Sequence, residues 1–469
     1  MLKISLNSVT MSNFNSLIDK VKSNLNENQL VYATISLIGA SGLAFRAYRL
    51  RSARAVLRTR WAKLRDDRYW GPAVKSGLSP STAIRPFKIE VPNSELEDLR
   101  VRLQRTRLAD SFDNTGFNYG MRSDVLKLVI DYWLNKYDWR QEEVKLNQFN
   151  HFKTEIEGLD IHYFHAKPGP GAKTVIPIMM VHGWPSSVVE YLKTTEILTQ
   201  PDQDGLAFEV ICPSLPGYGW SSPAARPGLN QLHTARIFVK LMERLGHQRF
   251  YYQAGDWGAI VGKNLAALFP ERVRGASLQI LSAPRNGSLP MFLGMYLNQP
   301  KLWSLLQQTG YMHIMGTKPD TIGVGLGDSP AGLAAWILEK FLVYGKNSKT
   351  TTDLSSLDRT FSMDDLLTNV MIYWLNGSAT SSSRFYKEWF SYECQVELKV
   401  DELVIPSSVP VGVTLFPHEV IPTTEGSARR AARNVVRFTK MDRGGHFGAF
   451  QEPQLLTNEI RAFVKQTLT

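Results

Sequence analysis

The sequence predicts an α/β doubly wound sheet, and three observations support that prediction. Short apolar runs with the length and composition of buried parallel strands recur along the middle of the chain. Segments with the periodicity of amphipathic helices separate the later runs, and this alternation is typical of a doubly wound fold. The chain has 469 residues, which is long for a single domain. A doubly wound core that carries a large insertion is one natural solution.

The strands and helices of the predicted core follow in a regular order. Segments 151–156 and 159–166 are expected to form a leading hairpin ahead of the parallel strands. The remaining strands are predicted at 175–181, 208–212, 250–253, 276–280, 409–415 and 435–441, with helices over 230–245 and 259–269. The core is therefore expected in two parts, residues 151–282 and residues 405–469.

Between the two parts of the core the strand signal stops, and apolar residues recur at helical spacing. Helices are predicted over 331–343 and 363–374. We expect residues 283–404 to form a helical cap over the sheet. The glycine-rich run over 323–327 has no strand before it, so a turn within the cap is favoured over a phosphate-binding loop.

Residues 50–150 are predicted to form an N-terminal extension that packs on the core. Ser94 and Glu97 have capping-box spacing, so a helix is expected to begin at this serine. A second helix is expected from Ser123. Its predicted apolar face comprises Val125, Leu128, Val129, Tyr132 and Trp133.

The net charge of +11 is concentrated in one block of the sequence. Residues 46–65 contribute eight Lys or Arg and no acid, which leaves +3 for the rest of the chain. A dispersed basic surface of the kind that binds nucleic acid is therefore not expected, and the sequence contains no zinc spacing and no Walker-type loop. Its two cysteines, Cys212 and Cys394, favour a reducing compartment without a structural disulfide.

Directly before the basic block, residues 30–45 carry no charged side chain. These sixteen residues are at the short end for a membrane span. The net charge is +1 before this stretch and +8 after it, so the positive-inside rule places the C-terminal bulk in the cytosol. We predict an uncleaved membrane anchor over residues 30–46, after a short segment at 1–29. An interfacial helix and a buried core helix are the alternatives.

Asp256 is the residue on which the functional prediction depends. It lies in Gly255-Asp-Trp-Gly258, between a predicted strand and a predicted helix, where an α/β-hydrolase normally has its serine. Ala254 and Gly258 on either side are small, as the strained turn of a nucleophile elbow requires. A serine here forms an acyl-enzyme, whereas an aspartate can attack a saturated carbon and form an alkyl ester. The alternative is a surface aspartate that caps the helix.

Three further segments lie where an α/β-hydrolase places the rest of its catalytic groups. Trp184 follows the strand that ends at residue 181, so its backbone N–H and that of Trp257 could bind one oxyanion. His446 follows the last predicted strand and is the expected general base, an ordinary loop histidine being the alternative. Glu419 follows the preceding strand and is the expected acidic partner of His446.

These motifs resemble those of the microsomal-type epoxide hydrolases, a group that includes the juvenile-hormone epoxide hydrolases. The resemblance covers nearly the whole chain and rests on Arg85-Pro-Phe-Lys, His182-Gly-Trp-Pro, Gly255-Asp-Trp-Gly, Gly310-Tyr-Met-His, Thr317-Lys-Pro-Asp, Arg384-Phe-Tyr-Lys-Glu and Arg443-Gly-Gly-His-Phe. It implies an α/β-hydrolase fold, catalysis without a cofactor or metal, and a single-pass location in the endoplasmic reticulum membrane. It also implies that Tyr311 and Tyr386 donate to the epoxide oxygen.

The expected reaction converts a lipophilic epoxide and water into a vicinal diol. Asp256 would form the ester, Tyr311 and Tyr386 would stabilise the opening oxygen, and His446 with Glu419 would activate the water. A haloalkane dehalogenase uses the same aspartate, but a departing halide needs no proton, so the paired tyrosines argue against it. A catalytically inactive binding module is the other alternative. The sequence leaves the physiological epoxide and the oligomeric state open.

Overall fold

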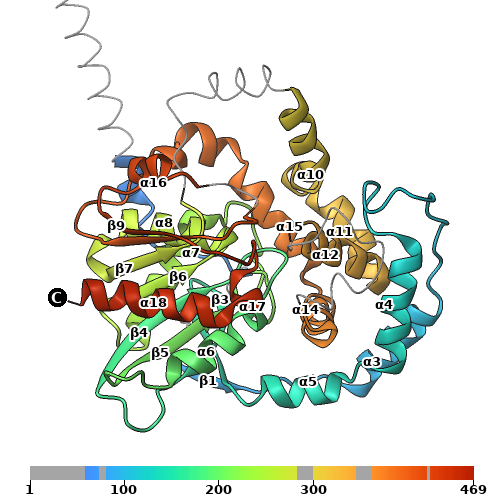
Figure 1. Ribbon diagram of the computed structural model, residues 1–469, viewed down its shortest axis with the longest axis horizontal. Helices are drawn as coiled ribbons and strands as arrows, with labels where there is room; N and C mark the ends of the chain where they lie inside the picture. Colours follow the sequence, from blue (N-terminus) through green and yellow to red (C-terminus); the bar gives the residue numbers. More distant parts are fainter. Residues whose placement is uncertain (1–58, 73–80, 282–298, 345–360, 420–422, 469) are drawn as a thin grey trace, which may run out of the picture. The chain divides into compact units, whose positions relative to one another are not determined.

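The structure is a computed structural model that describes residues 59–72, 81–281, 299–344, 361–419 and 423–468 (Figure 1). Its strands are β1 (Ile84–Phe87), β2 (Asn150–Ile156), β3 (Leu159–Ala166), β4 (Thr174–Val181), β5 (Leu206–Pro213), β6 (Phe250–Ala254), β7 (Val273–Leu278), β8 (Val411–Leu415) and β9 (Val435–Lys440).

The helices fall into three groups by position in the chain. Those of the extension are α3 (Asn93–Gln104), α4 (Ser123–Asn135) and α5 (Trp139–Leu146). Those of the core include the short η1 (Val188–Tyr191), α6 (Leu192–Thr199), α7 (Gln231–Arg244), α8 (Asp256–Leu268), α16 (Glu425–Ala431), α17 (Gly448–Gln451) and α18 (Pro453–Thr467). Those between β7 and β8 are α10 (Gln299–Thr317), α11 (Pro319–Asp328), α12 (Pro330–Tyr344), α14 (Met363–Leu375) and α15 (Ser378–Trp389).

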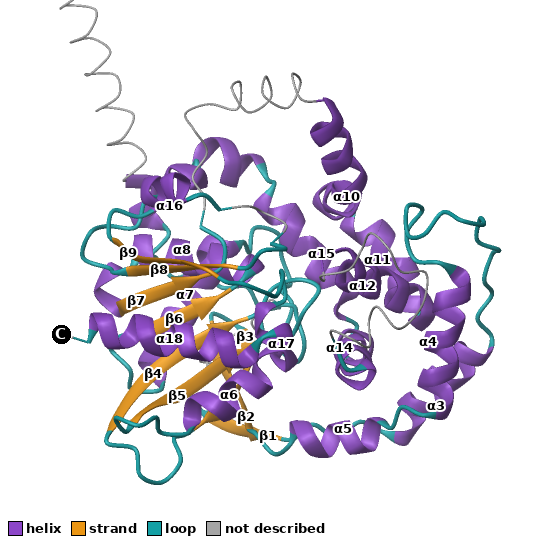
Figure 2. Ribbon diagram, in the orientation of Figure 1, coloured by secondary structure: helices purple, strands orange, loops and turns teal. Residues whose placement is uncertain are grey.

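All nine strands within the described ranges belong to one mixed sheet, in the order β1-β2-β3-β5-β4-β6-β7-β8-β9. The pairs from β1 to β5 are antiparallel, and the pairs from β5 to β9 are parallel. This is the α/β-hydrolase fold, so the fold predicted for the core is confirmed (Figure 2).

Alternating side chains of the central strands explain why helices cover both faces of the sheet. On β6, the ring of Tyr251 meets Phe463 of α18, whereas Tyr252 packs beside Gly262 of α8. Every residue of β6 is buried, as a parallel strand between two helical layers requires. Helices α6 and α18 cover one face and α7 and α8 the other (Figure 2).

The helices α10 to α15 gather beside the sheet and not on its faces (Figure 1). The extension lies against this group, because α12 contacts α3 and α4, and α14 contacts α5. The extension also supplies β1, which pairs with β2 and lengthens the sheet at that edge. One segment of the chain is therefore joined both to the core sheet and to the helices that follow β7.

The glycine-rich run predicted as a turn is helical instead. Residues 323–327 lie within α11. A Cβ atom on Gly323 would come within 2.2 Å of the Thr380 hydroxyl on α15, so the glycine allows two helices to pack closely. Glycine favours turns in isolation, but tertiary packing decides the local structure here.

Three details of the extension also differ from the sequence prediction. Helix α3 already begins at Asn93, so Ser94 lies in its first turn and not at its cap. On α4, Leu128 is exposed, although it was predicted on the apolar face. Strand β1 was not predicted, because its four residues include a proline and are mostly exposed, so no apolar alternation marks them.

The predicted membrane anchor at residues 30–46 lies outside the described residues. So do residues 1–29 and most of the basic block at 46–65. Of the helices that the structure does describe, none combines the length and the apolar character needed to cross a bilayer.

A buried ion pair fastens the turn between β2 and β3 to helix α7. Arg236 donates to both carboxylate oxygens of Glu157, at 2.7 and 2.6 Å, and both side chains are almost wholly buried. Glu157 also accepts from Trp70 Nε1 at 3.0 Å, and Arg236 donates to the Leu64 carbonyl at 2.6 Å. Such additional bonds are needed, because both charges lose their hydration on burial.

We predict that Arg236→Met lowers the free energy of unfolding by about 2 kcal/mol or more, because the buried Glu157 loses its bidentate partner and keeps one cation, Lys240, with Nζ at 2.9 Å. Arg384→Met is the matched control, since Arg384 pairs with Asp320 at 2.7 and 2.9 Å while both side chains are more than half exposed. An exposed pair contributes roughly 0–1 kcal/mol. Urea unfolding followed by circular dichroism measures both variants, and equal losses would contradict the prediction.

Candidate active site

Asp256 lies at the turn between β6 and α8, and its backbone is strained. Its φ is +43°, in the left-handed region that residues other than glycine rarely adopt, and it is the first residue of α8. The chain packs so closely around this turn that no Cβ atom would fit at two neighbouring glycine positions. A Cβ atom on Gly258 would lie 2.1 Å from the Val181 carbonyl, and one on Gly183 would lie 2.2 Å from Asp256 Oδ1. This is the geometry of a nucleophile elbow.

The loop after β4 supplies a backbone donor to this carboxylate. The N–H of Trp184 donates to Asp256 Oδ1 at 2.8 Å. His182 holds the loop in place: its Nε2 accepts from the Leu215 N–H at 3.2 Å, and its Nδ1 lies 3.0 Å from the next carbonyl. Burial lowers the pKa of His182 to about 4, so its imidazole is neutral. The Trp257 N–H belongs to the first turn of α8, where amides have no intrahelical acceptor, and its contact with an oxyanion stays a prediction.

Helix α14 fixes the same loop through two side chains. Asn369 Nδ2 donates to the Pro185 carbonyl at 2.7 Å, and the Tyr373 hydroxyl donates to the Ser186 carbonyl at 2.8 Å. Both bonds are buried, so they position the backbone that carries the Trp184 N–H. The sequence gives no local signal for this role, because both residues lie within an ordinary apolar helix.

His446 stands between two carboxylates. Its Nδ1 lies 2.6 Å from Glu419 Oε1, and its Nε2 lies 3.4 Å from Asp256 Oδ2. Glu419 follows β8 and His446 follows β9, and these two strands are parallel neighbours, so their C-terminal loops meet at one edge of the sheet. The Trp184 N–H binds Oδ1 of Asp256, so the other carboxylate oxygen, Oδ2, faces the imidazole of His446.

The charges around His446 determine its protonation. Burial alone would lower the pKa of His446, but Glu419 and Asp256 together raise it well above its ordinary value. The imidazole is therefore protonated at neutral pH and forms an ion pair with Asp256. Loss of the charge on Asp256 would remove part of this attraction and lower the pKa again. The basicity of His446 thus depends on the chemical state of Asp256.

Tyr311 and Tyr386 lie beside the elbow within a group of aromatic rings. The Tyr311 ring stacks on Trp184, with 4.9 Å between centroids, and the Tyr386 ring meets Trp257 edge-on at 4.7 Å. The two tyrosine rings are 6.0 Å apart. Burial, with a smaller effect from the charge of Asp256, raises the pKa of both phenols well above the ordinary value, so both are neutral proton donors. All seven residues predicted for the site are thereby brought together.

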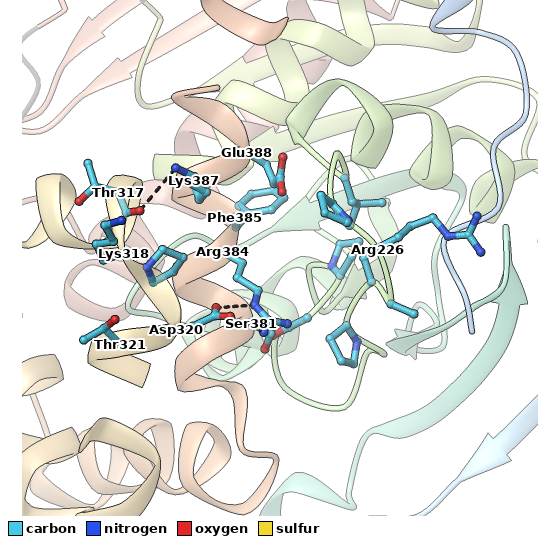
Figure 3. A pocket seen from close by; sticks show the side chains of 18 residues that line it. Arg226, Thr317, Lys318, Asp320, Thr321, Ser381, Arg384, Phe385, Lys387 and Glu388 are labelled. Atoms are coloured by element: carbon cyan, nitrogen blue, oxygen red, sulfur yellow. Dashed lines mark hydrogen bonds and ion pairs between the residues drawn. The ribbon is translucent and has the colours of Figure 1, made fainter. Parts of the chain in front are cut away.

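A pocket of about 560 Å³ opens between α11, α15 and the loop at 216–229 (Figure 3). Of its 18 lining residues, eight are proline, alanine, leucine or phenylalanine and nine are polar or charged, among them the Arg384–Asp320 ion pair (Figure 3). None of the predicted site residues lines it. Phe385 does line it, and the same ring meets Trp257 with 5.8 Å between centroids. One side chain therefore connects this pocket with the residue after the nucleophile.

Three ionisable side chains near the site carry no signal in the sequence. Lys340 lies in the middle of α12, with Nζ 4.3 Å from the Tyr311 ring centroid. The Tyr344 ring, at the end of α12, has its centroid 5.8 Å from that of His446. Glu190 lies in η1 and is 5 % exposed, and burial raises its pKa to about 7. Only their positions in the folded chain identify them.

Comparison with known proteins gives consistent matches along the chain. Residues 84–191 match the family described as epoxide hydrolase N terminus, and residues 176–301 match the alpha/beta hydrolase fold family. Epoxide hydrolase 1 of Sus scrofa is 42 % identical over 424 residues, which cover 86 % of this chain and 93 % of that protein. Juvenile hormone epoxide hydrolase 2 of Ctenocephalides felis is 39 % identical over 419 residues, covering 85 % and 89 %. The crystal structure of juvenile hormone epoxide hydrolase from the silkworm Bombyx mori superimposes with a TM-score of 0.80 at 34 % identity, covering 86 % of this chain and 98 % of that one.

We predict that Glu190 makes stability depend on pH between about 4.5 and 7. Its pKa is higher in the folded chain, so its contribution to stability is complete below its unfolded pKa and is lost as the pH rises through about 7. The unfolding free energy of the wild type minus that of Glu190→Gln should therefore fall by roughly 3 kcal/mol across this range. Urea unfolding at a series of pH values measures it. Glu196→Gln, at an exposed position on α6, is the control, and a flat difference for Glu190→Gln would contradict the prediction.

Proposed function

The chain belongs to the epoxide hydrolase family, and we propose that it hydrolyses lipophilic epoxides through an ester of Asp256, with residue roles as follows. One observation carries the assignment: the Asp256 carboxylate lies between the Trp184 N–H and His446, next to two neutral phenols. A nucleophile, an oxyanion donor, a base and two acids within one site are what epoxide opening followed by ester hydrolysis requires.

In the first step Asp256 Oδ2 attacks an epoxide carbon, and the bond from that carbon to the ring oxygen breaks. Oδ1 accepts from the Trp184 N–H at 2.8 Å, whereas Oδ2 has the longer contact to His446 Nε2 at 3.4 Å, so we assign Oδ2 as the nucleophilic oxygen. Negative charge passes to the ring oxygen, where Tyr311 and Tyr386 can donate to it. Placing two donors where charge develops lowers the barrier more than binding the neutral epoxide alone would.

In the second step a water molecule attacks the carbonyl carbon of the Asp256 ester. Esterification has removed the charge of Asp256, so the pKa of His446 falls and the imidazolium releases its proton to solvent. The neutral imidazole can then accept a proton from the attacking water. Glu419 holds Nδ1 and stabilises the imidazolium that results. The tetrahedral oxyanion forms at Oδ1, where the Trp184 N–H, and we propose also the Trp257 N–H, stabilises it. Collapse releases the second diol oxygen, which takes a proton from His446.

A haloalkane dehalogenase is not favoured by the comparisons, since the relatives that cover most of the chain are named epoxide hydrolases. The pair of neutral tyrosines supports the same conclusion, because a halide leaves without a proton. An inactive binding module is also not favoured, since every group that the two steps need is present in one site.

We propose lipophilic epoxides as the substrate class. The side chains around Asp256 are aromatic: Trp184, Trp257, Tyr311 and Tyr386 stack or meet edge-on. An aromatic enclosure favours an apolar substrate that has one polar oxygen. Relatives named for juvenile hormone and the relative named epoxide hydrolase 1 match at 39 % and 42 % identity, so terpenoid epoxides are a natural first series to assay.

We also propose that residues 30–46 anchor the protein in the endoplasmic reticulum membrane, with the catalytic domain in the cytosol. The support is the uncharged stretch at 30–45 followed by eight basic residues. An anchor would hold the site close to substrates that partition into lipid.

The ester mechanism predicts where oxygen from water goes in a single turnover. With enzyme in excess over a terpenoid epoxide in ¹⁸O water, the label should enter the Asp256 carboxylate and not the diol. Mass analysis of the peptide that contains Asp256 measures this. His446→Gln should accumulate an enzyme heavier by the mass of the substrate, because the ester forms but is not hydrolysed. Label in the diol after one turnover would reject Asp256 as nucleophile, and halide release from a chloroalkane would favour the dehalogenase.

The anchor predicts resistance to alkaline extraction. The full chain should remain in the membrane pellet after carbonate treatment, whereas a variant that lacks residues 1–46 should be released and keep its activity towards a water-soluble epoxide. Release of the full chain would support an interfacial helix instead. Glycosylation at Asn376, in the acceptor pattern Asn-Gly-Ser, would contradict the cytosolic orientation.

A further inference from the structure

We propose that Lys340 is a positioning residue that makes Tyr311 the tyrosine that gives up its proton, while Tyr386 stays a neutral hydrogen-bond donor. This inference rests on the proposed function, which assigns the two tyrosines jointly to the epoxide oxygen. It adds a division of labour between them and a cation on the cap that causes it.

Lys340 presents a buried cation to one face of the acid pair. Its Nζ lies 4.3 Å from the centroid of the Tyr311 ring and 6.0 Å from that of Tyr344. Lys340 is 6 % exposed, and its charge in the resting site is balanced by the carboxylate of Glu339. A buried ammonium over an aromatic ring is attracted to the ring and is stabilised further when that ring acquires negative charge.

The two tyrosines have different electrostatic surroundings. The ring neighbours of Tyr386 include Trp184 at 5.7 Å and Trp257 at 4.7 Å, both neutral indoles. In the described part of the chain, the cation contacts to these phenols come from Lys340 and are made to Tyr311. The hydrogen bond between Tyr311 and the Tyr386 hydroxyl lowers the pKa of Tyr311, whereas that with Tyr344 raises it, and the Tyr344 hydroxyl donates to the Gln308 carbonyl at 3.1 Å. A phenolate at Tyr311 would thus have a cation and one hydroxyl donor, that of Tyr386.

The reaction moves one negative charge towards this cation. Before ring opening the charge is on Asp256, and burial together with that charge raises the pKa of both tyrosines. When Asp256 becomes an ester, its charge passes to the epoxide oxygen. That oxygen takes the hydroxyl proton of one tyrosine, so an O–H bond forms on the product and a phenolate remains. A buried phenolate is costly without a counter-charge, and Lys340 supplies one at Tyr311.

The second step returns the protons that ring opening moved. Hydrolysis of the ester regenerates Asp256 with one oxygen from water, and the carboxylic acid that forms releases a proton. The phenolate of Tyr311 takes up that proton by way of the site water, which restores the neutral phenol. His446, which released a proton to solvent when the ester formed, regains one from solvent once Asp256 is charged again. No oxidant, reductant or further reactant is needed. Lys340 therefore affects ester formation, and ester hydrolysis should depend on it much less.

The test is a double-mutant cycle on the single-turnover rate of ester formation, measured by rapid quench and mass analysis of the Asp256 peptide. Lys340→Met should slow ester formation at least tenfold, whereas Lys340→Arg, which keeps the charge, should stay within threefold of wild type. In a Tyr311→Phe background Lys340→Met should cause no further loss. In a Tyr386→Phe background the full tenfold loss should remain.

The cycle separates the proposal from a structural role. An equal loss in both tyrosine backgrounds would overturn it, because a general disturbance of α12 would not depend on Tyr311. If Lys340→Met does not fold, Lys340→Gln provides the same uncharged comparison. Lys318→Met removes an exposed cap lysine and is the control for net charge. If Tyr311→Phe alone leaves ester formation unchanged, the proposed role of Tyr311 fails. If Tyr311→Phe slows ester formation and Lys340→Met does not, the role of Tyr311 stands and the proposal for Lys340 fails.

Discussion

The left-handed backbone at Asp256 is the constraint on which the rest of the site depends. Holding a non-glycine residue at φ +43° costs about 1–3 kcal/mol, so the surrounding chain must fix it. Gly258 and Gly183 let β4 and its following loop approach within van der Waals contact. That approach brings the Trp184 N–H to 2.8 Å from Oδ1 and turns Oδ2 towards His446. The strained backbone thus presents a carboxylate with two distinct oxygens, Oδ1 bound by the Trp184 N–H and Oδ2 facing His446.

In the proposed mechanism a single charge, that of Asp256, controls both half-reactions. While Asp256 is ionised, it helps to keep His446 protonated and both phenols neutral, which suits ring opening. Once Asp256 is esterified, the same groups lose that influence, and His446 can become a base. The two proposed steps therefore require no conformational switch, because the covalent state of Asp256 changes the pKa of His446. Glu419 is 2 % exposed and is paired with Nδ1 of His446 in both steps. It therefore holds the imidazole in place and does not determine when His446 becomes a base.

The sequence predicts the site residues that belong to the core but not those that belong to the cap, and the reason is physical. Trp184, Asp256, Glu419 and His446 each follow a strand end, and parallel strands carry their C-terminal loops to one edge of the sheet, so chain order implies proximity. Tyr311 lies within a helix, where spacing alone does not separate a catalytic tyrosine from a packed one. The tyrosine pair was therefore predicted only by family resemblance, and Lys340 and Asn369 were not predicted at all. The run at 323–327 was predicted wrongly because its close contact with α15 comes from a distant segment.

The cap helices and the extension affect the site indirectly, by packing against the elements that hold its residues. Helix α14 holds the oxyanion loop through Asn369 and Tyr373, and it is itself tied to the extension, where the Tyr137 hydroxyl lies 3.0 Å from that of Thr368. Helix α12 carries Lys340 and packs on α3 and α4. The position of a side chain on a helix is fixed only when the element that packs behind that helix is also fixed. The extension thus supports α12, which carries Lys340, and α14, which holds the loop of Trp184 in place.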